Sequence, residues 1–459
     1  MSQIQERYDA LAYPARVTSA SEPARMAAIA RMHGHAGADP ATARVLDIGC
    51  GVGTNALNLA MLQPRSTVVG IDVSGVQIDA AKAARQTLGV ANARFEHVDL
   101  TQLPSDFGEF DYIVAHGLYA WIPDEVRQRL LAVVAQHLAP SGVALISYNI
   151  QPGWAFRSMA RELMLRASGP AEPEHVVARA REALSDAVET APEHSAWRHA
   201  LAGLHAEVQD FSDADLFHDL LAHVCEPVWF HQFHSAAGQA GLRYMGESTF
   251  PETADLLLGN ERRAALTELG SDLAARQTFK DALLNRAFRS SLMVRASNKI
   301  DSKYSPIRLQ ELFVWTDLNR TDVAGRYLSP SRGAVTLSEP ALARVLDTLI
   351  AARPSAVLAR DLPGNPDAVL HNLVGLWGYG FVDARVGQTR CADLSARPVA
   401  HSLARLLCQT GVVPNRRHES VNVDSEDAAL LALLDGSREV AATELEAVRR
   451  FAQAGLLTP

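Results

Sequence analysis

Three glycines at alternate positions are the residues whose spacing points most directly to chemistry. Gly49, Gly51 and Gly53 follow the short apolar run 45–48 and precede a helix-like segment that begins near Thr54. Glycine lets the backbone turn sharply and approach a ligand without a Cβ in the way. The start of a helix presents free N–H groups to that ligand. The pattern therefore predicts a strand, a glycine loop and a helix that together hold a nucleotide.

The spacing of the glycines distinguishes this loop from other nucleotide-binding loops. A dinucleotide fingerprint has the form G-x-G-x-x-G and a phosphate loop the form G-x-x-x-x-G-K-[ST], and this loop fits neither. A second apolar run, 66–71, ends at Asp72, where a carboxylate can accept hydrogen bonds from both ribose hydroxyls. Ser74 and Gln77 are predicted to form a capping box at the next helix. The glycines and Asp72 resemble motif I and its acidic partner in class I S-adenosylmethionine-dependent methyltransferases; the alternative is a loop that only turns the chain.

Alternating strands and helices must position these residues. Beyond Asp72 we predict helices at 75–87 and 124–138 and strands at 93–98, 110–115 and 142–148. This alternation is typical of a parallel sheet with right-handed crossovers, and such sheets bind ligands beyond the carboxyl ends of their strands. That edge would carry Gly49, Asp72, Asp99, His116, Tyr148 and Asn149. Asp99 is expected either to accept the adenine amino group or to cap the turn before Pro104.

Helical insertions are expected to interrupt the sheet. Helices are predicted at 154–167, 174–190, 193–207 and 213–224, after which a helix at 229–240 and strands at 242–247 and 290–296 resume the core. The last strand is predicted to be antiparallel. One insertion follows strand five and another separates strands six and seven, and we expect both to shape the substrate site. The segment before residue 40, which contains Tyr13, is expected to be a surface arm or a lid over the cofactor.

The composition changes from residue 307 onward. Short strands are predicted at 309–315, 333–337 and 378–384, with helices at 340–352 (capped by Ser338), 356–361 and 366–377. This α+β pattern is typical of a winged-helix-like unit, but the 366–377 helix has no Lys or Arg, so contact with protein or a homodimer fits better than DNA. The predicted domains are an arm (1–40), the core with strands one to five (41–150), a helical insertion (151–228), the end of the core with a second insertion (229–298), and the C-terminal winged-helix-like unit with a helical tail (299–459).

The composition of the whole chain limits the classes of function. At 459 residues and 48% hydrophobic content, the chain is expected to form more than one globular core. The net charge of −9 disfavours nucleic acid and anionic membrane as main partners. The N-terminus lacks a signal-peptide core and no apolar stretch could span a bilayer, so we expect no membrane insertion and a cytoplasmic location. No metal site is predicted, because no known zinc spacing is matched by the four cysteines or by the group His218, His223, Cys225, His231 and His234.

Several longer segments together resemble one bacterial family. They are Tyr8-Asp9 with Tyr13-Pro14, the glycine loop, and residues 110–123, 147–154, 226–231 and 285–289. They resemble the bacterial class I methyltransferases that carry a methyltransferase regulatory domain, a group similar to the lysine methyltransferases of bacterial outer-membrane proteins. The resemblance covers most of residues 1–297. It implies a seven-stranded Rossmann-like α/β core with S-adenosylmethionine as cofactor and S-adenosylhomocysteine as product, and it suggests a protein lysine as the methyl acceptor.

Methyl transfer from a sulfonium is an in-line displacement, so the site must align the reactants and exclude water. The cofactor contacts that the resemblance and the strand ends imply are Tyr13, Asp47, Gly49, Gly51, Gly53, Asp72, Val73, Gln77, Asp99, Leu100 and His116. The candidate catalytic residues are His116, Tyr119, Trp121, Tyr148 and Asn149.

Each candidate catalytic residue has a chemical role and a structural alternative. His116 could accept a proton from an amine or order its loop. Trp121, with Trp154, could flank the channel of a cationic side chain or pack against the inserted helices. Tyr148 and Asn149 could hydrogen-bond the acceptor or close the turn after the fifth strand.

The sequence therefore predicts an S-adenosylmethionine-dependent methyltransferase that acts on a protein side chain, with lysine favoured. The first alternative is a small-molecule O- or N-methyltransferase. A deep pocket closed by the arm would favour that alternative, whereas an open groove beneath the C-terminal unit would favour a protein substrate. The second alternative is a non-catalytic interaction protein that retains the fold, which the intact glycine loop and Asp72 disfavour.

Overall fold

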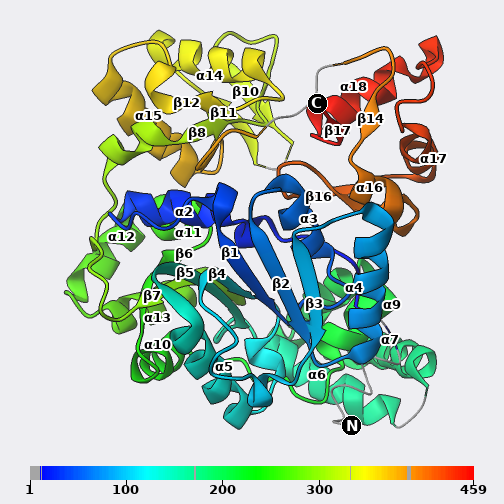
Figure 1. Cartoon of the computed structure of the whole chain (residues 1–459). Coiled ribbons are helices and arrows are strands. Elements are labelled where there is room, and N and C mark those ends of the chain that lie inside the picture. Colours follow the sequence, from blue (N-terminus) through cyan, green and yellow to red (C-terminus); the bar gives the residue numbers. More distant parts are fainter. Residues whose placement is uncertain (1–10, 12, 170–171, 331, 390–393) are drawn as a thin grey trace.

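A seven-stranded sheet organises the chain as far as its seventh strand (Figure 1). The computed structural model describes residues 11, 13–169, 172–330, 332–389 and 394–459. The strands lie in the order β3-β2-β1-β4-β5-β7-β6, with β7 antiparallel to both neighbours. The predicted Rossmann-like α/β core is confirmed, including its antiparallel last strand. The strand bounds are β1 Arg44–Ile48, β2 Thr67–Asp72, β3 Ala93–His97, β4 Phe110–Ala115, β5 Leu138–Asn149, β6 Leu242–Glu247 and β7 Phe288–Arg295.

Helices cover both faces of the sheet. Successive residues of a strand point to opposite faces, so each strand contributes side chains to an apolar core on either side of the sheet. Val45 belongs to the core shared with α3 and α4, whereas its neighbour Leu46 belongs to the core shared with α5 and α10. This two-sided burial is what the continuous apolar run in β1 predicted. The helices are α3 (Thr54–Leu62), α4 (Gly75–Leu88), α5 (Asp124–His137) and α10 (Phe230–Gln239).

The first insertion follows β5 and has a small apolar core of its own. The predicted helix 213–224 is wrong in its second half: α9 (Asp213–Asp215) runs into a π-helical turn, Leu216–Leu220, and regular helix stops there. The π turn is held by tertiary contacts with the arm and is not visible in the local sequence pattern. The other helices of this insertion are α6 (Ala155–Ser168), α7 (Pro173–Thr190) and α8 (Ala196–Gln209).

The second insertion separates β6 from β7 and faces the C-terminal half of the chain. Phe250 at its start stacks on Trp377, with ring centroids 4.1 Å apart. The three helices of this insertion do not line the main cavity, and the segment contributes to the lining only Ala287, directly before β7. The prediction that the inserted helices shape the ligand site therefore agrees with the lining for the first insertion alone. Its helices are α11 (Phe250–Ala254), α12 (Gly259–Glu268) and α13 (Leu273–Leu284).

The chain beyond β7 forms two small units along the top of Figure 1. In the first, the predicted strand 309–315 starts instead as a 3₁₀ turn (Pro306–Glu311), and only β8 (Phe313–Trp315) is extended. The predicted helix 356–361 is a two-residue strand, β12, and a 3₁₀ turn, because Val357 and Leu358 pair with β8. Ser338 does not cap α14, whose N-cap is Glu339 without a side-chain bond. The remaining elements are α14 (Pro340–Ala352), α15 (Pro366–Gly378), β13 (Asp383–Arg385) and the antiparallel strands β9 (Asn319–Arg320), β10 (Arg326–Ser329) and β11 (Gly333–Thr336).

The second unit packs three helices and a β-hairpin around a separate apolar core. The hairpin joins β15 (Val412–Pro414) to β16 (Ser420–Asn422). A further two-stranded sheet pairs β14 (Val399–Ala400) with β17 (Leu457–Thr458). The helices are α16 (Ser402–Leu407), α17 (Ser425–Leu433) and α18 (Leu445–Gln453).

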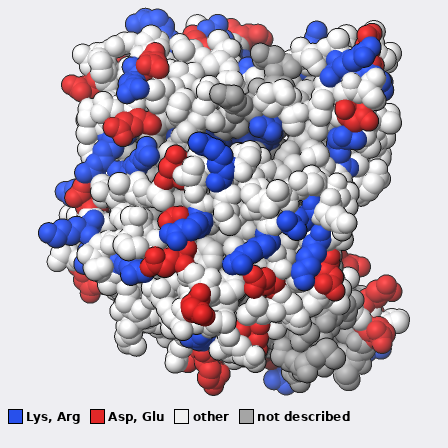
Figure 2. Space-filling model, in the orientation of Figure 1, with Lys and Arg blue, Asp and Glu red and all other residues white. Residues whose placement is uncertain are grey.

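The surface carries charges of both signs. Figure 2 shows Lys and Arg interspersed with Asp and Glu over this face, without a continuous basic stripe. Among the described residues, no helix is both long enough and apolar enough to cross a membrane.

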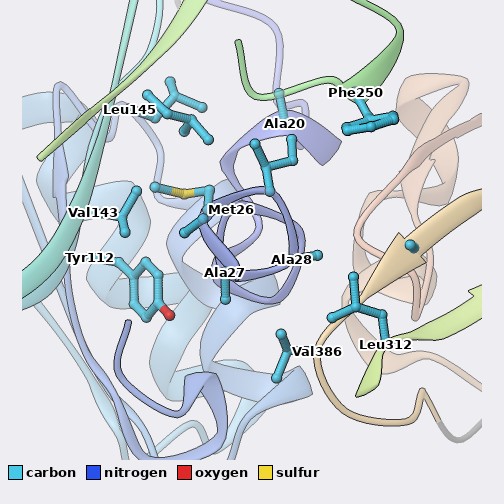
Figure 3. Packing of buried hydrophobic residues seen from close by; sticks show 14 of the residues in the cluster. Ala20, Met26, Ala27, Ala28, Tyr112, Val143, Leu145, Phe250, Leu312 and Val386 are labelled. Carbon is cyan, nitrogen blue, oxygen red and sulfur yellow. The ribbon is translucent and has the colours of Figure 1, made fainter. Parts of the chain in front are cut away.

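Helix α2 (Pro23–Met32) packs against both the sheet and the C-terminal half of the chain. In Figure 3, Met26 points toward Tyr112 of the sheet, while Val386 of the C-terminal half lies on another side of the helix. The Val386 amide donates a hydrogen bond to the Ala24 carbonyl oxygen over 3.0 Å. These contacts fix α2, and with it the segment that precedes it, against the core.

Candidate active site

A cavity of about 710 Å³ lies at the carboxyl ends of the parallel strands. The loop after β1, the ends of β2, β3, β4 and β5, the segment 13–18 and the first insertion all line it. This is the edge at which the predicted site residues were expected to meet.

The glycine loop forms one wall of the cavity. Gly49, Gly51 and Gly53 have φ angles of 74°, 54° and 75°, which L-residues with a Cβ rarely adopt. The Gly51 amide donates to Asp72 Oδ2 over 2.9 Å, and a Cβ on Gly51 would lie 2.9 Å from Gln77 Oε1. Gly49, Gly51, Asp72, Val73 and Gln77 line the cavity, whereas Gly53 does not and serves the turn into α3.

Two carboxyl groups lie beside the glycine loop: the buried Asp47 in β1 and the partly buried Asp72 at the end of β2. Asp47 accepts a hydrogen bond from Asn55 Nδ2 over 3.1 Å, and Asp72 Oδ1 accepts one from the Ser74 amide over 2.8 Å. Burial raises the pKa of Asp47 to about 7 and also raises that of Asp72. A cationic ligand beside these groups would lower both pKa values again and so stabilise the ionised carboxylates. Ser74 caps α4 as predicted, through the Gln77 amide, while the Gln77 side chain lies at the cavity.

Asp99 follows β3 and lines the cavity with Leu100. Its Oδ1 accepts hydrogen bonds from both the amide and the hydroxyl of Thr101, each over 2.8 Å. The capping alternative is therefore observed, and the second carboxylate oxygen has no bond to Thr101. Contact with adenine stays a prediction.

The candidate catalytic residues divide into two groups. His116, Trp121 and Asn149 line the cavity, whereas Tyr119 and Tyr148 do not. Tyr148 is buried, and its hydroxyl shares a hydrogen bond of 2.9 Å with Ser291 Oγ beneath the sheet edge. The ring of Tyr119 packs edge-on against that of Tyr148, with centroids 6.0 Å apart. Both tyrosines therefore contribute to the core under the site.

Aromatic rings surround the lining residues that follow β4 and β5. The His116 ring packs edge-on against Phe288, with centroids 5.8 Å apart, and Trp121 packs edge-on against Trp154 at 5.9 Å. Burial lowers the pKa of His116 to about 4, so its ring is neutral at physiological pH. Asn149 lies 4.0 Å, nitrogen to sulfur, from Cys225 of the first insertion.

The segment before α2 lies along the cavity. Residues 13–18 line it, and the Arg16 guanidinium pairs with Asp215 of the first insertion through two bonds of 2.9 Å. The Tyr13 hydroxyl donates to Asp219 Oδ2 over 3.4 Å. The lid alternative expects this segment at the cavity, and closure over a bound cofactor stays a prediction. Tyr8 and Asp9 are outside the described residues.

The histidines noted in the sequence are spread over different elements. His218 lines the cavity and its Nε2 lies 2.7 Å from the Leu11 carbonyl oxygen, whereas His231 and His234 are on α10. Within the described part of the chain, His, Cys, Asp and Glu side chains form no group of three or more that could hold a metal ion.

A buried polar network connects the cavity to the C-terminal hairpin. Asn55, which lines the cavity, accepts a hydrogen bond through Oδ1 from His418 Nε2 over 2.8 Å. His418 Nδ1 lies 2.9 Å from Asn58 Nδ2, and His401 Nε2 lies 2.6 Å from Asn58 Oδ1. Burial lowers the pKa of His418 to about 3, with Arg25 adding to the effect, so the neutral ring donates at Nε2 and accepts at Nδ1. Sequence reasoning missed Asn55; its position in the first turn of α3 was the available signal.

The residues present fit S-adenosylmethionine. That ligand carries a sulfonium and an ammonium cation, and the cavity offers the carboxylates of Asp47 and Asp72 beside a glycine loop that brings the backbone close. When bound, S-adenosylmethionine supplies an electrophilic methyl group.

Three segments match known protein families. Residues 45–142 match a family described as "Methyltransferase domain", residues 212–295 match "Predicted methyltransferase regulatory domain" and residues 396–459 match "PKMT, C-terminal winged helix domain". The predicted C-terminal winged helix is confirmed, although the match lies in the tail and not in the 307–384 segment whose pattern suggested it.

Alignments with individual proteins cover longer parts of the chain. The chain is 30% identical over 302 residues to the uncharacterized protein RP789 of Rickettsia prowazekii, an alignment that covers 64% of this chain but only 53% of that relative. It is 33% identical over 228 residues to the uncharacterized protein RP028 of the same organism, covering 49% of this chain and 91% of the relative.

A solved structure, PKMT2 from Rickettsia typhi in complex with AdoHcy, shares the fold with a TM-score of 0.84 at 21% identity, over 97% of this chain and 93% of that one. The sheet order, the glycine loop and the family matches agree: the chain belongs to the class I S-adenosylmethionine-dependent methyltransferases that carry a methyltransferase regulatory domain.

Proposed function

We propose that this protein transfers a methyl group from S-adenosylmethionine to the side-chain amine of a protein lysine. The observation that carries the proposal is the composition of the cavity beyond the glycine loop. Its rings include those of Trp121, Trp154 and Phe288, and its polar groups include Asn149 and Asp219. Aromatic faces and a carboxylate favour a cationic side chain such as lysine.

The C-terminal match supports a protein as the acceptor. The family matched by residues 396–459 is named for PKMT, that is, protein lysine methyltransferase, and the R. typhi neighbour carries the same name. Winged-helix units commonly read nucleic acid, but here the hairpin β15–β16 packs on α3. The net charge of −9 and the mixed charges in Figure 2 do not favour nucleic acid either.

A small-molecule acceptor is the second candidate. The segment 13–18 lies along the cavity, and no described residue after Phe288 lines it. A cavity bordered by the arm and not roofed by the C-terminal units is the arrangement that the small-molecule alternative predicted. The acceptor must therefore be identified by experiment.

The test uses the purified full chain with radiolabelled S-adenosylmethionine. A panel of lysine-rich proteins is compared with the same proteins after their lysines have been blocked by acetylation, and with a set of small amines, phenols and carboxylic acids. The proposal expects label in the unblocked proteins and none in the blocked ones. Equal label in blocked and unblocked proteins, or label in small molecules alone, would contradict it.

A further inference from the structure

The first insertion places one carboxyl group in the cavity by means of an unusual backbone turn. Asp219 lies on the π-helical turn Leu216–Leu220 and lines the cavity together with His218 and Leu220. Single π turns are rare in proteins overall, but those that occur lie frequently at functional sites. Such a turn points its side chains in directions that a regular helix would not. Asp219 is 147 residues away in sequence from Asp72, which lies beside the glycine loop, and it lies on a different wall of the cavity.

The other carboxylates that line the cavity already have strong partners. Asp47 is bonded by Asn55, Asp72 by two backbone amides and Asp99 by Thr101. Glu207 is neutralised by the Arg157 guanidinium, which donates to both of its oxygens over 2.8 Å. Each of these groups therefore has a positioning or cofactor role before any acceptor arrives.

Asp219 differs from them because, among the described residues, it has neither an ion-pair partner like that of Glu207 nor a hydrogen bond as short as those of Asp47, Asp72 and Asp99. The Arg16 guanidinium, whose charge lowers the pKa of Asp219, gives two hydrogen bonds to Asp215. The only hydrogen bond to the Asp219 carboxylate in the described structure comes from the Tyr13 hydroxyl, at a long 3.4 Å. A half-buried carboxylate at a cavity wall, with spare acceptor capacity on both oxygens, is suited to an incoming cation.

The electrostatics agree with this geometry. Burial raises the pKa of Asp219 to about 7, and the charge of Asp215 adds to the effect, while Tyr13 and Arg16 oppose it. The pKa of His116, by contrast, is lowered to about 4 by burial, so His116 is a weak proton acceptor. A base whose pKa lies near the working pH is the better match for general base chemistry. The titratable or charged groups that face Asp219 are Tyr13 and Arg16 from the arm, Asp215 and His218 from its own segment, and Cys225.

We propose that the Asp219 carboxylate binds the ammonium group of the methyl acceptor and takes its proton. The inference rests on the proposed function, since it assumes an amine acceptor. One N–H bond of the ammonium breaks and one O–H bond forms on Asp219, which leaves a neutral amine with a free electron pair. That pair forms the new N–C bond while the C–S electron pair stays on sulfur, and the proton on Asp219 returns to solvent when the product leaves. No oxidant, reductant or metal is needed.

The test measures amine binding separately from methyl transfer. The full chain is saturated with S-adenosylhomocysteine and titrated with n-butylammonium chloride, which mimics the lysine side chain, by isothermal titration calorimetry. We expect Asp219→Asn to weaken butylammonium binding at least tenfold and to leave S-adenosylhomocysteine binding within twofold of wild type. The neutral probe 1-pentanol should bind both proteins equally, since the substitution preserves the shape of the site.

The matched control is Asp213→Asn, which removes the same charge from an exposed position on the same segment. It should leave butylammonium binding unchanged. Absence of butylammonium binding in the wild type, or equal binding by wild type and Asp219→Asn, would overturn the inference. If binding depends on Asp219 but no protein or amine accepts label from S-adenosylmethionine, the amine site stands and the proposed lysine methylation fails.

Discussion

Replacing His418 by alanine tests whether the hairpin β15–β16 helps to hold Asn55 and Asp47 in place beside the glycine loop. His418 is fully buried at the tip of the β15–β16 hairpin and bonds two asparagines of α3. One of these, Asn55, lines the cavity and donates to the Asp47 carboxylate over 3.1 Å. The substitution therefore loosens a side chain that holds a predicted cofactor contact, although His418 itself does not line the cavity.

The expected size of the effect follows from the bonds that remain. Asn55 Oδ1 retains donors in Ser21 Oγ (2.9 Å) and the Thr18 amide (3.4 Å), so the loss of His418 removes one of three. A neutral hydrogen bond contributes about 0.5–1.5 kcal/mol, which corresponds to an affinity for S-adenosylhomocysteine that is about 2- to 13-fold weaker. Two lost bonds and a small cavity in the core should lower the free energy of unfolding by about 2–4 kcal/mol.

His401→Ala is the matched control for this prediction. His401 is also a buried, neutral histidine of the C-terminal unit, but it bonds Asn58, which does not line the cavity. Both variants should unfold at lower denaturant concentration, whereas only His418→Ala should lose affinity in calorimetric titration with S-adenosylhomocysteine. If both variants lose stability and neither loses affinity, the hairpin serves the fold alone and the coupling inferred here is wrong.

Three further substitutions have distinct expected results. Asp72→Ala should weaken S-adenosylhomocysteine binding by about 10- to 100-fold, because the carboxylate accepts bonds from the Gly51 and Ser74 amides and is predicted to accept bonds from the ribose; unchanged affinity in calorimetry would remove Asp72 from the cofactor contacts. His116→Ala should lower turnover in a methyl-transfer assay and leave cofactor affinity within about twofold, and normal turnover would show that the ring is dispensable. Asp219→Asn should raise the free energy of unfolding of the ligand-free protein by about 1–3 kcal/mol at pH 8, since a pKa raised to about 7 makes the native carboxyl favour its proton and lose stability as pH rises from about 4 to 7. The gain in the free energy of unfolding should vanish near pH 4 in urea titrations. A gain that is independent of pH would contradict the raised pKa of Asp219.

The sheet and its flanking helices were predictable because their signals are local. β4 (Phe110–Ala115) and α14 (Pro340–Ala352) have the bounds that the apolar pattern predicted. The glycine loop was equally visible, since only glycine adopts such φ angles at alternate positions without strain. Short elements in the C-terminal half were less predictable: Val357 and Leu358 are extended because they pair with β8 across 43 residues of sequence, and local propensity does not encode that partner.

The site itself was only partly predictable. Tyr148 and Asn149 were chosen together, but consecutive strand residues point to opposite faces, so Tyr148 enters the core and Asn149 lines the cavity. Asn55 and His418 are 363 residues apart, and nothing near either residue reveals that they are bonded. The position of Asp219 depends on a π turn that the local pattern presented as ordinary helix.

The most direct test of protein lysine methylation is mass spectrometry of the acceptor. The full chain is incubated with trideuteromethyl S-adenosylmethionine and a lysine-rich protein, and the protein is digested and mapped. We expect trideuteromethyl groups on lysine side chains with the wild type and at least tenfold fewer with Asp219→Asn. Trideuteromethyl groups on other residue types, or on none while a small amine or acid in the same mixture is methylated, would contradict the proposed function.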